Sequence, residues 1–375
     1  MKGWAGAKRS SLGGETTTKQ VVLMGTFPPP VHGMAAANQA VQERLVAVGW
    51  IVHRLNTSPQ TLNRTVMARL GRFPMVLRAW LYLINFYLKK ENRRATTYIA
   101  LSGGWGQLYD LISVFLCKLM GMHIVMHHHS FFYLDNYRIL SNCVFKVAGK
   151  GADHVVLCNK MREALKIRYQ VQKVLVLSNV VLFPIAEQFI PRVELRTIGF
   201  LSNITYEKGG DVVIKLARAI KKRKMPLKVI VAGPCHDEQL KFELLKAGNE
   251  GIIQWMGAVY GNNKAKFWAE IDAFIFPTQY ENEAEPLVLW EALAAAVPIL
   301  AYSRGCISEQ IADAAGIAIP IEDDFIEVVL PILESWVQNH EFYRTLAAST
   351  RKYYAGVAEC HASSWKEFER LLLNN

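Results

Sequence analysis

Two glutamates, Glu283 and Glu291, stand eight positions apart after the apolar run 274–276. Pro286 lies between them and fits the first position of a helix, where its missing N–H costs nothing. Glu291 would then lie about five residues into that helix, roughly 7.5 Å along its axis. A partly buried carboxylate needs hydrogen-bond donors, and the hydroxyls of a ligand would serve. A helix N-terminus beside them can hold an anion such as a phosphate. The alternative is that the acidic residues here only complement the helix dipole.

A second cluster, Lys208-Gly209-Gly210, follows the apolar run 197–201. Glycines let backbone amides approach an anion, and the lysine supplies a positive charge. Asp211 suits the N-cap of a helix predicted over 211–224. An ordinary glycine-rich turn with a solvated lysine is the alternative interpretation.

Histidines at 123 and 127–129 mark one predicted strand. Adjacent residues of a strand point to opposite faces, so His127, His128 and His129 cannot all converge on one ion. We therefore predict no metal site and no cofactor. His129 and, second, His127 remain candidates for contact with a substrate, against the alternative that they are packed or solvent-facing.

The elements that position these residues alternate between strand and helix. Strands are predicted at 21–24, 51–55, 97–101, 123–127, 154–158 and 174–177, and again at 197–201, 227–232, 252–256, 273–277, 298–302 and 317–320. This alternation predicts an α/β fold with two parallel-sheet domains. In such sheets ligands bind beyond the carboxyl ends of the strands, where all three clusters fall.

The predicted boundaries divide the chain into four parts. Residues 1–19 form a loose tail, 20–183 an amino-terminal α/β domain, 184–355 a second α/β domain, and 356–375 a final helix. A linker is placed near 183–192, where Pro184 and Pro191 lie.

The composition excludes several classes of protein. Of 375 residues, 51% are hydrophobic, which argues against a disordered or fibrous chain. The six cysteines form no C-x-x-C pair, which argues against a disulfide scaffold or a cysteine zinc site and favours a reducing, cytoplasmic compartment. The first 19 residues lack the apolar stretch of a signal peptide, and no uncharged run is long enough to span a membrane.

The positive charge is concentrated in one segment. Residues 60–95 hold eight basic residues and one acidic residue, while the whole chain has a net charge of +11. The segment is also rich in aromatic residues, which is typical of helices at an anionic membrane surface. No nucleic-acid-binding motif accompanies it, so a nucleic-acid partner is not expected. The candidate membrane or acceptor contacts are Arg69, Arg72, Arg78, Trp80, Lys89 and Lys90. The alternative is an apolar face packed on the domain with solvated arginines.

The spacing of Glu283 and Glu291 resembles the E-x7-E signature of retaining GT-B glycosyltransferases, in particular family 4. The stretch 304–309, Arg-Gly-Cys-Ile-Ser-Glu, resembles that family's G-G-x-x-E loop. The stretch 199–211 resembles its G-R-L-S-x-x-K-G loop, with Lys208 as the lysine. In this alignment Phe200 stands where an arginine is usual, the loop is two residues longer, and Asn203 is a neutral candidate to replace that cation.

The resemblance implies roles for individual residues. Glu283 would contact the donor sugar and Glu291 the ribose hydroxyls of the nucleotide. Lys208 would hold the diphosphate together with the helix N-terminus at Pro286, Leu287 and Val288. In the first domain, Gly33 matches the opening glycine loop near the donor, with His32 beside it, and His129 matches a site histidine at the end of its strand, with His127 as the second choice.

The implied activity is a retaining, metal-independent transfer of a hexosyl or N-acetylhexosaminyl group. The expected donor is a nucleotide-diphosphate sugar, with a UDP-sugar favoured and a GDP-sugar possible. The expected acceptor is a lipid-linked or glycan precursor of a polysaccharide or lipopolysaccharide, with the protein peripheral on the inner face of the membrane. The expected fold has two Rossmann-like domains facing a cleft and a last helix that returns to the first. A GT-B sugar-nucleotide epimerase and a non-catalytic nucleotide-sugar-binding subunit are the alternatives.

Overall fold

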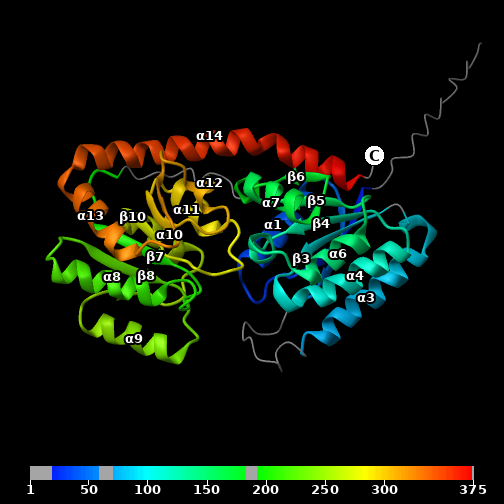
Figure 1. The fold of residues 1–375 in the computed structure, drawn as a ribbon, viewed down its shortest axis with the longest axis horizontal. Helices are drawn as coiled ribbons and strands as arrows, with labels where there is room; N and C mark the ends of the chain where they lie inside the picture. Colours follow the sequence, from blue (N-terminus) through cyan, green and yellow to red (C-terminus); the bar gives the residue numbers. More distant parts are fainter. Residues whose placement is uncertain (1–18, 59–70, 94, 183–191, 374–375) are drawn as a thin grey trace, which may run out of the picture.

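The computed structural model describes residues 19–58, 71–93, 95–182 and 192–373. The expected linker and tail therefore lie almost wholly outside the described residues, as does Arg69. Figure 1 shows two lobes with one long helix, α14 (His340–Leu372), running across both.

The first lobe is built on a six-stranded sheet of order β2-β1-β3-β4-β5-β6, in which all strand pairs are parallel. Its strands are β1 (Gln20–Gly25), β2 (Ile51–Asn56), β3 (Thr96–Leu101), β4 (Ile124–His128), β5 (Asp153–Val156) and β6 (Val174–Val176). Its helices are α1 (Gly33–Ala47), α3 (Phe73–Leu88), α4 (Gln107–Leu119), α5 (Phe132–Asp135), α6 (Ile139–Ala148) and α7 (Asn159–Tyr169).

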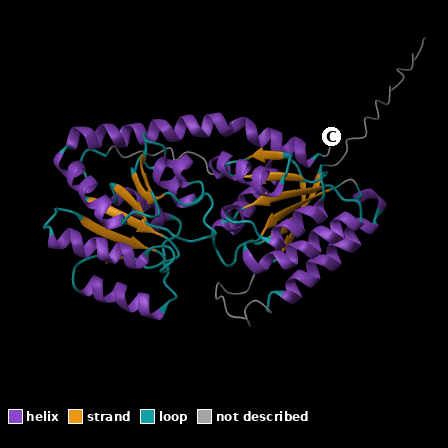
Figure 2. Cartoon of the chain, viewed as in Figure 1, coloured by secondary structure: helices purple, strands orange, loops and turns teal. Residues whose placement is uncertain are grey.

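The second lobe repeats this plan with the order β12-β11-β10-β7-β8-β9, again parallel throughout. Its strands are β7 (Thr197–Leu201), β8 (Lys228–Ala232), β9 (Gln254–Trp255), β10 (Ala273–Phe276), β11 (Ile299–Tyr302) and β12 (Gly316–Ile319). Its helices are α8 (Gly210–Lys222), α9 (Glu238–Asn249), α10 (Asn262–Glu270), α11 (Leu287–Ala294), α12 (Ile307–Ile311) and α13 (Phe325–Gln338), followed by α14. The two parallel sheets confirm the predicted fold class (Figure 2).

The central strands are continuous apolar runs because helices cover both faces of a parallel sheet. All four residues of β10 are buried, as are all five of β7. Every strand predicted from such a run is present, with ends that shift by a few residues. The runs therefore place the loops that follow β4, β7 and β10 at the carboxyl edges of the two sheets.

Helix α14 links the two lobes through its buried face. Near its start, Tyr343 and Tyr354 pack into the core of the second lobe. Near its end, Trp365, Phe368 and Leu372 pack into a cluster of the first lobe. A helix of 33 residues spans roughly 50 Å, enough to bridge two small domains.

Two details of the helix starts differ from the sequence prediction. Gly209, in the left-handed conformation with φ of 82°, caps α8, so the prediction that Asp211 is the N-cap is wrong. Asp211 lies in the first turn and pairs with Lys215 one turn later. Pro286 occupies the N-cap of α11 rather than the first helical position, with ψ of 125°. Among the described residues, none of the helices is long and apolar enough to cross a membrane.

Candidate active site

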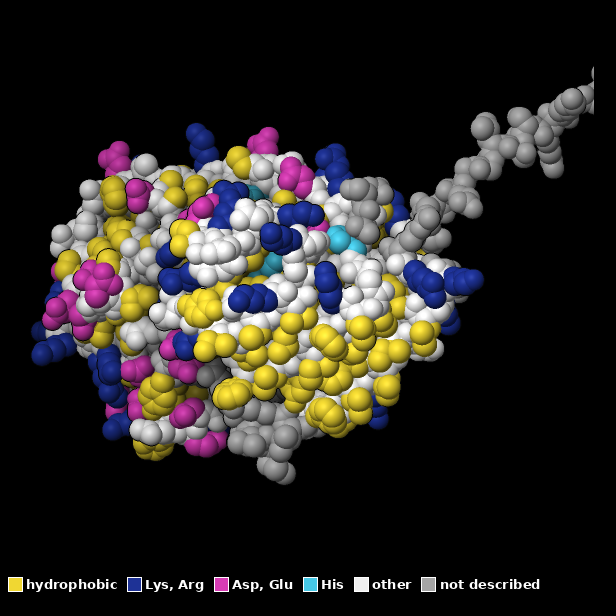
Figure 3. All heavy atoms as spheres, turned by 45° about the vertical axis from the view of Figure 1, so that its right-hand side comes forward, with side chains coloured by type: hydrophobic (Ala, Val, Ile, Leu, Met, Phe, Trp, Pro, Cys, Tyr) yellow, Lys and Arg dark blue, Asp and Glu magenta, His cyan; other side chains and the backbone are white. Residues whose placement is uncertain are grey.

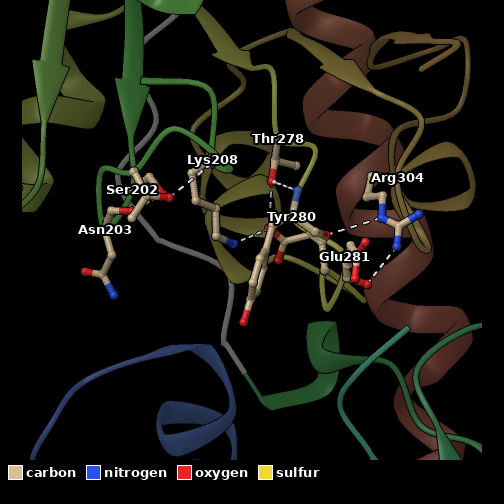
Figure 4. A network of polar contacts seen from close by, with 9 residues as sticks. Ser202, Asn203, Lys208, Thr278, Tyr280, Glu281 and Arg304 are labelled. Atoms are coloured by element: carbon tan, nitrogen blue, oxygen red, sulfur yellow. Dashed lines mark hydrogen bonds and ion pairs between the residues drawn. The ribbon is translucent and has the colours of Figure 1, made fainter. Parts of the chain in front are cut away.

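Lys208 and Glu283 meet at the carboxyl edge of the second sheet. They lie 75 residues apart in the chain, but β7 and β10 are neighbours in the sheet, so the loops that follow them adjoin. The Lys208 ammonium forms an ion pair with Glu283 Oε2, which also accepts a hydrogen bond from Thr278 Oγ1 at 3.2 Å. Lys208 Nζ lies 4.6 Å from the centre of the Tyr280 ring (Figure 4). The site thus holds a cation and a carboxylate on one edge.

Gly209 allows the lysine loop to reach this edge. Its φ of 82° favours glycine, and a Cβ there would lie 2.5 Å from the carbonyl oxygen of Pro277. Any side chain would therefore push the loop away from β10 and move Lys208 from its partner.

Glu291 is held in a different way, by the helix that precedes β10. Its Oε1 accepts a hydrogen bond from Lys264 Nζ at 2.7 Å, and its Oε2 accepts one from Trp268 Nε1 at 3.2 Å. The side chain remains 20% exposed. A carboxylate can accept about four hydrogen bonds, so Glu291 keeps capacity for ligand hydroxyls.

Glu285, only two residues after Glu283, serves the connection between the domains instead. Its carboxylate accepts hydrogen bonds from Ser178 Oγ at 2.7 Å and from the Asn179 backbone N–H at 2.6 Å. Burial raises the pKa of Glu285 to about 8. Glu281, by contrast, is exposed. Of the three clustered acids, only Glu283 faces Lys208.

The histidines of β4 divide between the two faces of the strand, as the alternation predicts. His128 lies on one face, bonded to Tyr133 OH at 2.8 Å and to His154 at 2.9 Å. His127 and His129 lie on the other, with ring centres 4.1 Å apart. His127 is wholly buried and contacts Tyr98 OH at 2.7 Å, whereas His129 is only partly buried, at the end of the strand.

The Nε2 atoms of His127 and His129 are buried and have no hydrogen-bond partner within the part of the chain that the structure describes. Such orphaned polar atoms are costly unless a ligand or water satisfies them. Burial, with a smaller contribution from His32, lowers the pKa of His129 to about 3. His129 therefore offers a neutral imidazole.

His32 and Gly33 form the start of α1 near His129. His32 caps the helix, since its Nδ1 accepts a hydrogen bond from the Ala35 backbone N–H at 3.4 Å. Burial, with a smaller effect of Arg72, lowers the pKa of His32 to about 4. No atom lies within 4 Å of the position that a Cβ on Gly33 would take, so the first turn of α1 faces open space.

Contacts between the lobes bring the two sets of residues close to each other. Ser130 Oγ lies 2.9 Å from Asn282 Oδ1, which joins the residue after His129 to the residue before Glu283. The Arg304 guanidinium forms an ion pair with Asp135 of the first lobe and also donates to the carbonyl oxygens of Tyr280 and Glu281 (Figure 4).

A disulfide, Cys158–Cys306, also connects the lobes, although the cysteine pattern favoured a reducing compartment. The two residues are 148 positions apart, and no short spacing rule could pair them. Beside the disulfide, the Glu309 carboxylate accepts hydrogen bonds from the backbone N–H groups of Asn159 and Lys160, at 3.1 and 2.6 Å. The loop that resembles the family's G-G-x-x-E motif thus caps α7 of the opposite lobe.

Phe200 stands where the family loop usually has an arginine, and it offers no polar group at that position. Its side chain is fully buried within β7, next to Phe276. Asn203 follows the end of the strand and lies near Lys208 (Figure 4).

The expected membrane contacts separate into two groups. Trp80 is 8% exposed and donates from Nε1 to Ser113 Oγ at 2.8 Å, so it is not a surface contact. Arg72 points inward and donates from Nε to the Thr57 carbonyl oxygen at 2.6 Å. Arg78, Lys89 and Lys90 are exposed.

Four supporting residues were not predicted: Thr278, Tyr280, Lys264 and Trp268. The last two stand four positions apart on α10, on the face that meets Glu291, but many surface helices share that spacing. No group of three or more His, Cys, Asp or Glu side chains that could hold a metal ion occurs among the described residues.

This chain is similar to a known protein family in sequence and to known proteins in structure. Residues 185–352 match the family model described as Glycosyl transferases group 1. No curated protein matches the chain in sequence.

Solved structures are similar over most of the chain. A sucrose-phosphate synthase from Thermosynechococcus elongatus has a TM-score of 0.72 at 13% identity, covering 95% of this chain and 99% of that one. HepE from Anabaena, in complex with UDP and glucose, has a TM-score of 0.66 at 14% identity, covering 94% and 99%. TarM has a TM-score of 0.61 at 16% identity, and this chain spans only 58% of its length. At these identities the likeness shows the fold, which is GT-B.

Proposed function

We propose that this chain is a retaining, metal-independent family 4 glycosyltransferase that uses a nucleotide-diphosphate sugar. The observation that carries the proposal is the Lys208–Glu283 pair on the edge of the second sheet. The orphaned imidazole of His129 lies next to it in the chain contacts, because Ser130 meets Asn282, the residue before Glu283. The family match of residues 185–352 and the UDP and glucose named for the HepE structure favour a UDP-sugar donor, with a GDP-sugar as the second choice.

The donor diphosphate would lie between Lys208 and the first turn of α11. Lys208 would stabilise the negative charge that grows on the leaving group, and preorganised electrostatics of this kind is often the largest catalytic contribution. The free N–H groups at Leu287 and Val288 would add to it. Glu291, already fixed by Lys264 and Trp268, would accept hydrogen bonds from the ribose hydroxyls.

The sugar would lie on the side of Glu283 and His129. Glu283 would accept from a sugar hydroxyl, and the neutral imidazole of His129 would supply a hydrogen bond without adding charge. An oxocarbenium-like transition state with donor and acceptor on one face would give retention, because no carboxylate is placed as an evident nucleophile. His32 and Gly33, at the open first turn of α1, would border the diphosphate.

We place the acceptor in the cleft on the side of the first lobe. A lipid-linked or glycan acceptor suits this side, with the protein in the cytoplasm against the inner face of the membrane. Asn203 would contact the donor as a neutral group, so this site would hold the diphosphate with one cation fewer than the usual family loop.

Donor turnover tests the proposal. Thermal shift with UDP-, GDP-, ADP- and dTDP-sugars identifies the ligand, because a specific ligand raises the apparent stability. Slow hydrolysis of that donor, or transfer to a glycan acceptor with retained anomeric configuration, is the expected result. Release of an epimerised nucleotide sugar would indicate the epimerase, and binding without any turnover would indicate a binding subunit.

A further inference from the structure

The outward faces of α3 and α4 are apolar. On α3, Phe73, Leu77, Leu81 and Leu88 are 40–68% exposed, and on α4, Leu108, Ile112, Phe115 and Leu119 are 43–72% exposed. We call these eight residues the α3–α4 face. Their spacing of three, four or seven residues puts each set on one side of its helix.

This face is not part of the core. The opposite sides of the same helices are already buried, with Val76, Leu83, Val114 and Cys117 at 0% exposure. The bond from Trp80 to Ser113 fixes the two helices side by side, as Figure 1 shows. Figure 3 shows one continuous apolar surface over this part of the molecule. Soluble proteins rarely expose a patch beyond a few hundred Å², and larger ones mark interaction sites.

Basic side chains surround the α3–α4 face. Exposed basic side chains on α3, α4, α6 and their connections are Arg78, Lys89, Lys90, Arg93, Lys118, Arg138 and Lys146. Dark blue side chains border the apolar surface in Figure 3. Of the acidic side chains described between residues 73 and 150, Asp110 is buried and Asp135 is paired with Arg304. A surface that combines exposed apolar side chains with unopposed cations is complementary to an anionic bilayer.

The amino-terminal end of α4, where the α3–α4 face begins, lies close to the contact between the two lobes. Gly103 touches Asn282, so closely that a Cβ on Gly103 would lie 2.1 Å from Asn282 Oδ1. Two residues later Trp105 is 69% exposed, and α4 begins at Gln107. The apolar surface therefore starts beside the mouth of the proposed acceptor site.

We propose that the α3–α4 face docks on an anionic lipid bilayer and holds the mouth of the cleft at the membrane surface. Leucine, isoleucine and phenylalanine side chains enter the interface between headgroups and acyl chains, and the basic side chains contact lipid phosphates. Docking itself needs no donor. That the docked cleft receives a membrane-borne acceptor rests on the glycosyltransferase function proposed above.

Flotation of the full-length protein with vesicles tests the surface. Vesicles of phosphatidylcholine with phosphatidylglycerol are expected to carry the protein, and pure phosphatidylcholine to carry at least about tenfold less, since the basic side chains around the face lose the attraction of the anionic headgroups. Leu81→Glu with Phe115→Glu is expected to reduce binding by at least about tenfold, because two charges would enter the apolar layer. The matched control is Phe242→Glu with Leu245→Glu, which charges two exposed apolar residues of α9 in the other lobe.

The outcomes test the docking surface and the glycosyltransferase function separately. Equal flotation of the two double variants, or no flotation of the wild type, would overturn the docking surface. A dimer in solution that Leu81→Glu with Phe115→Glu dissociates would assign the face to a second copy of the chain instead. Donor-induced thermal shift and donor hydrolysis in detergent-free buffer should be unchanged in this variant, so a failure of donor turnover with intact flotation would count only against the glycosyltransferase.

Discussion

The carboxyl edges of the two sheets hold different chemistry although their folds repeat one plan. At the second sheet the polar groups are charged and paired, Lys208 with Glu283 and Lys264 with Glu291. At the first sheet they are imidazoles, and burial holds the pKa values of His32 and His129 at about 4 and about 3. A diphosphate needs cations and a nucleotide needs fixed acceptors, whereas a sugar centre that becomes positive is best met by groups without positive charge. This difference fits the proposed arrangement, in which the second edge binds the nucleotide diphosphate and the first edge contacts the sugar.

Removing the cation of the second edge should have the largest effect. Lys208→Ala is expected to lower the donor turnover number by roughly 100-fold or more, since a preorganised charge at the leaving group is lost. Steady-state kinetics with the donor found by thermal shift measures it. Glu283→Gln should also lower turnover, because its neutral amide replaces the carboxylate beside Lys208 and Thr278.

Lys215→Ala is the matched control for that variant. Lys215 also pairs with a carboxylate, Asp211 at 2.8 Å, but on the exposed side of α8. It should keep wild-type turnover. Equal kinetics of Lys208→Ala and the wild type would remove the charged edge from the mechanism.

Removing the His129 imidazole, at the first edge, should lower turnover less than removing the Lys208 ammonium. His129→Ala is expected to lower turnover by about 30-fold, the cost of one lost hydrogen bond in a buried site. His129→Gln, which can still donate one, should recover part of this loss. His340→Ala, on an exposed histidine of the other lobe, is the control.

The pH profile separates a neutral from a charged role for His129. A pKa lowered to about 3 means that the imidazole is already neutral at pH 5 and stays so to pH 8. Protonation would begin only as the pH falls toward 4, so His129 should add no acid limb near 6.5. An acid limb near 6.5 in wild-type kcat that disappears in His129→Gln would contradict this assignment and show a protonated imidazole at work.

Loss of Glu291, the proposed nucleotide contact, should have a smaller effect, confined to binding. Glu291→Gln is expected to weaken UDP binding about tenfold, or about 1.4 kcal/mol, with little change in kcat. One charge-assisted contact is lost, while Lys208 and the reacting centre are untouched. Isothermal calorimetry measures the Kd, and a fall in kcat larger than the change in Kd would place Glu291 at the chemistry instead.

The difference between the two sheet edges also shows which parts of the fold and of the site could be predicted from the sequence. The strands were predictable because buried parallel strands are continuous apolar runs, and the edge of the second sheet was predictable because Lys208, Glu283 and Glu291 stand at recognisable spacings. The partners Thr278, Lys264 and Trp268 were not, since contacts between elements depend on the packing of β7, β10 and α10. Phe200 shows the limit of motif alignment: the alignment locates the missing cation at a buried residue, but it does not identify the group that replaces it.

The α3–α4 face was only half predicted for a related reason. The segment's charge and aromatic content suggested a membrane surface, but Trp80 and Arg72 turn inward, and α4 supplies half of the apolar surface without any basic cluster of its own. Composition along the chain reports an average over both sides of a helix. Only the packing of each helix shows which side remains exposed.

The disulfide allows the last and smallest test of the two edges, because it ties them together. Cys158 lies between β5 and α7, and Cys306 lies just before α12, beside the Glu309 cap. In many enzymes the opening of a closed active site limits the rate, so Cys306→Ala is expected to raise kcat by about two- to fivefold. It should also lower Tm by several degrees, since a crosslink over 148 residues constrains the unfolded chain. Dithiothreitol should give the wild type the same change and leave Cys306→Ala unaffected. A reductant effect of equal size in both proteins would mean that the lobes are held by Ser130, Arg304 and Glu309 and that the crosslink does not restrain them.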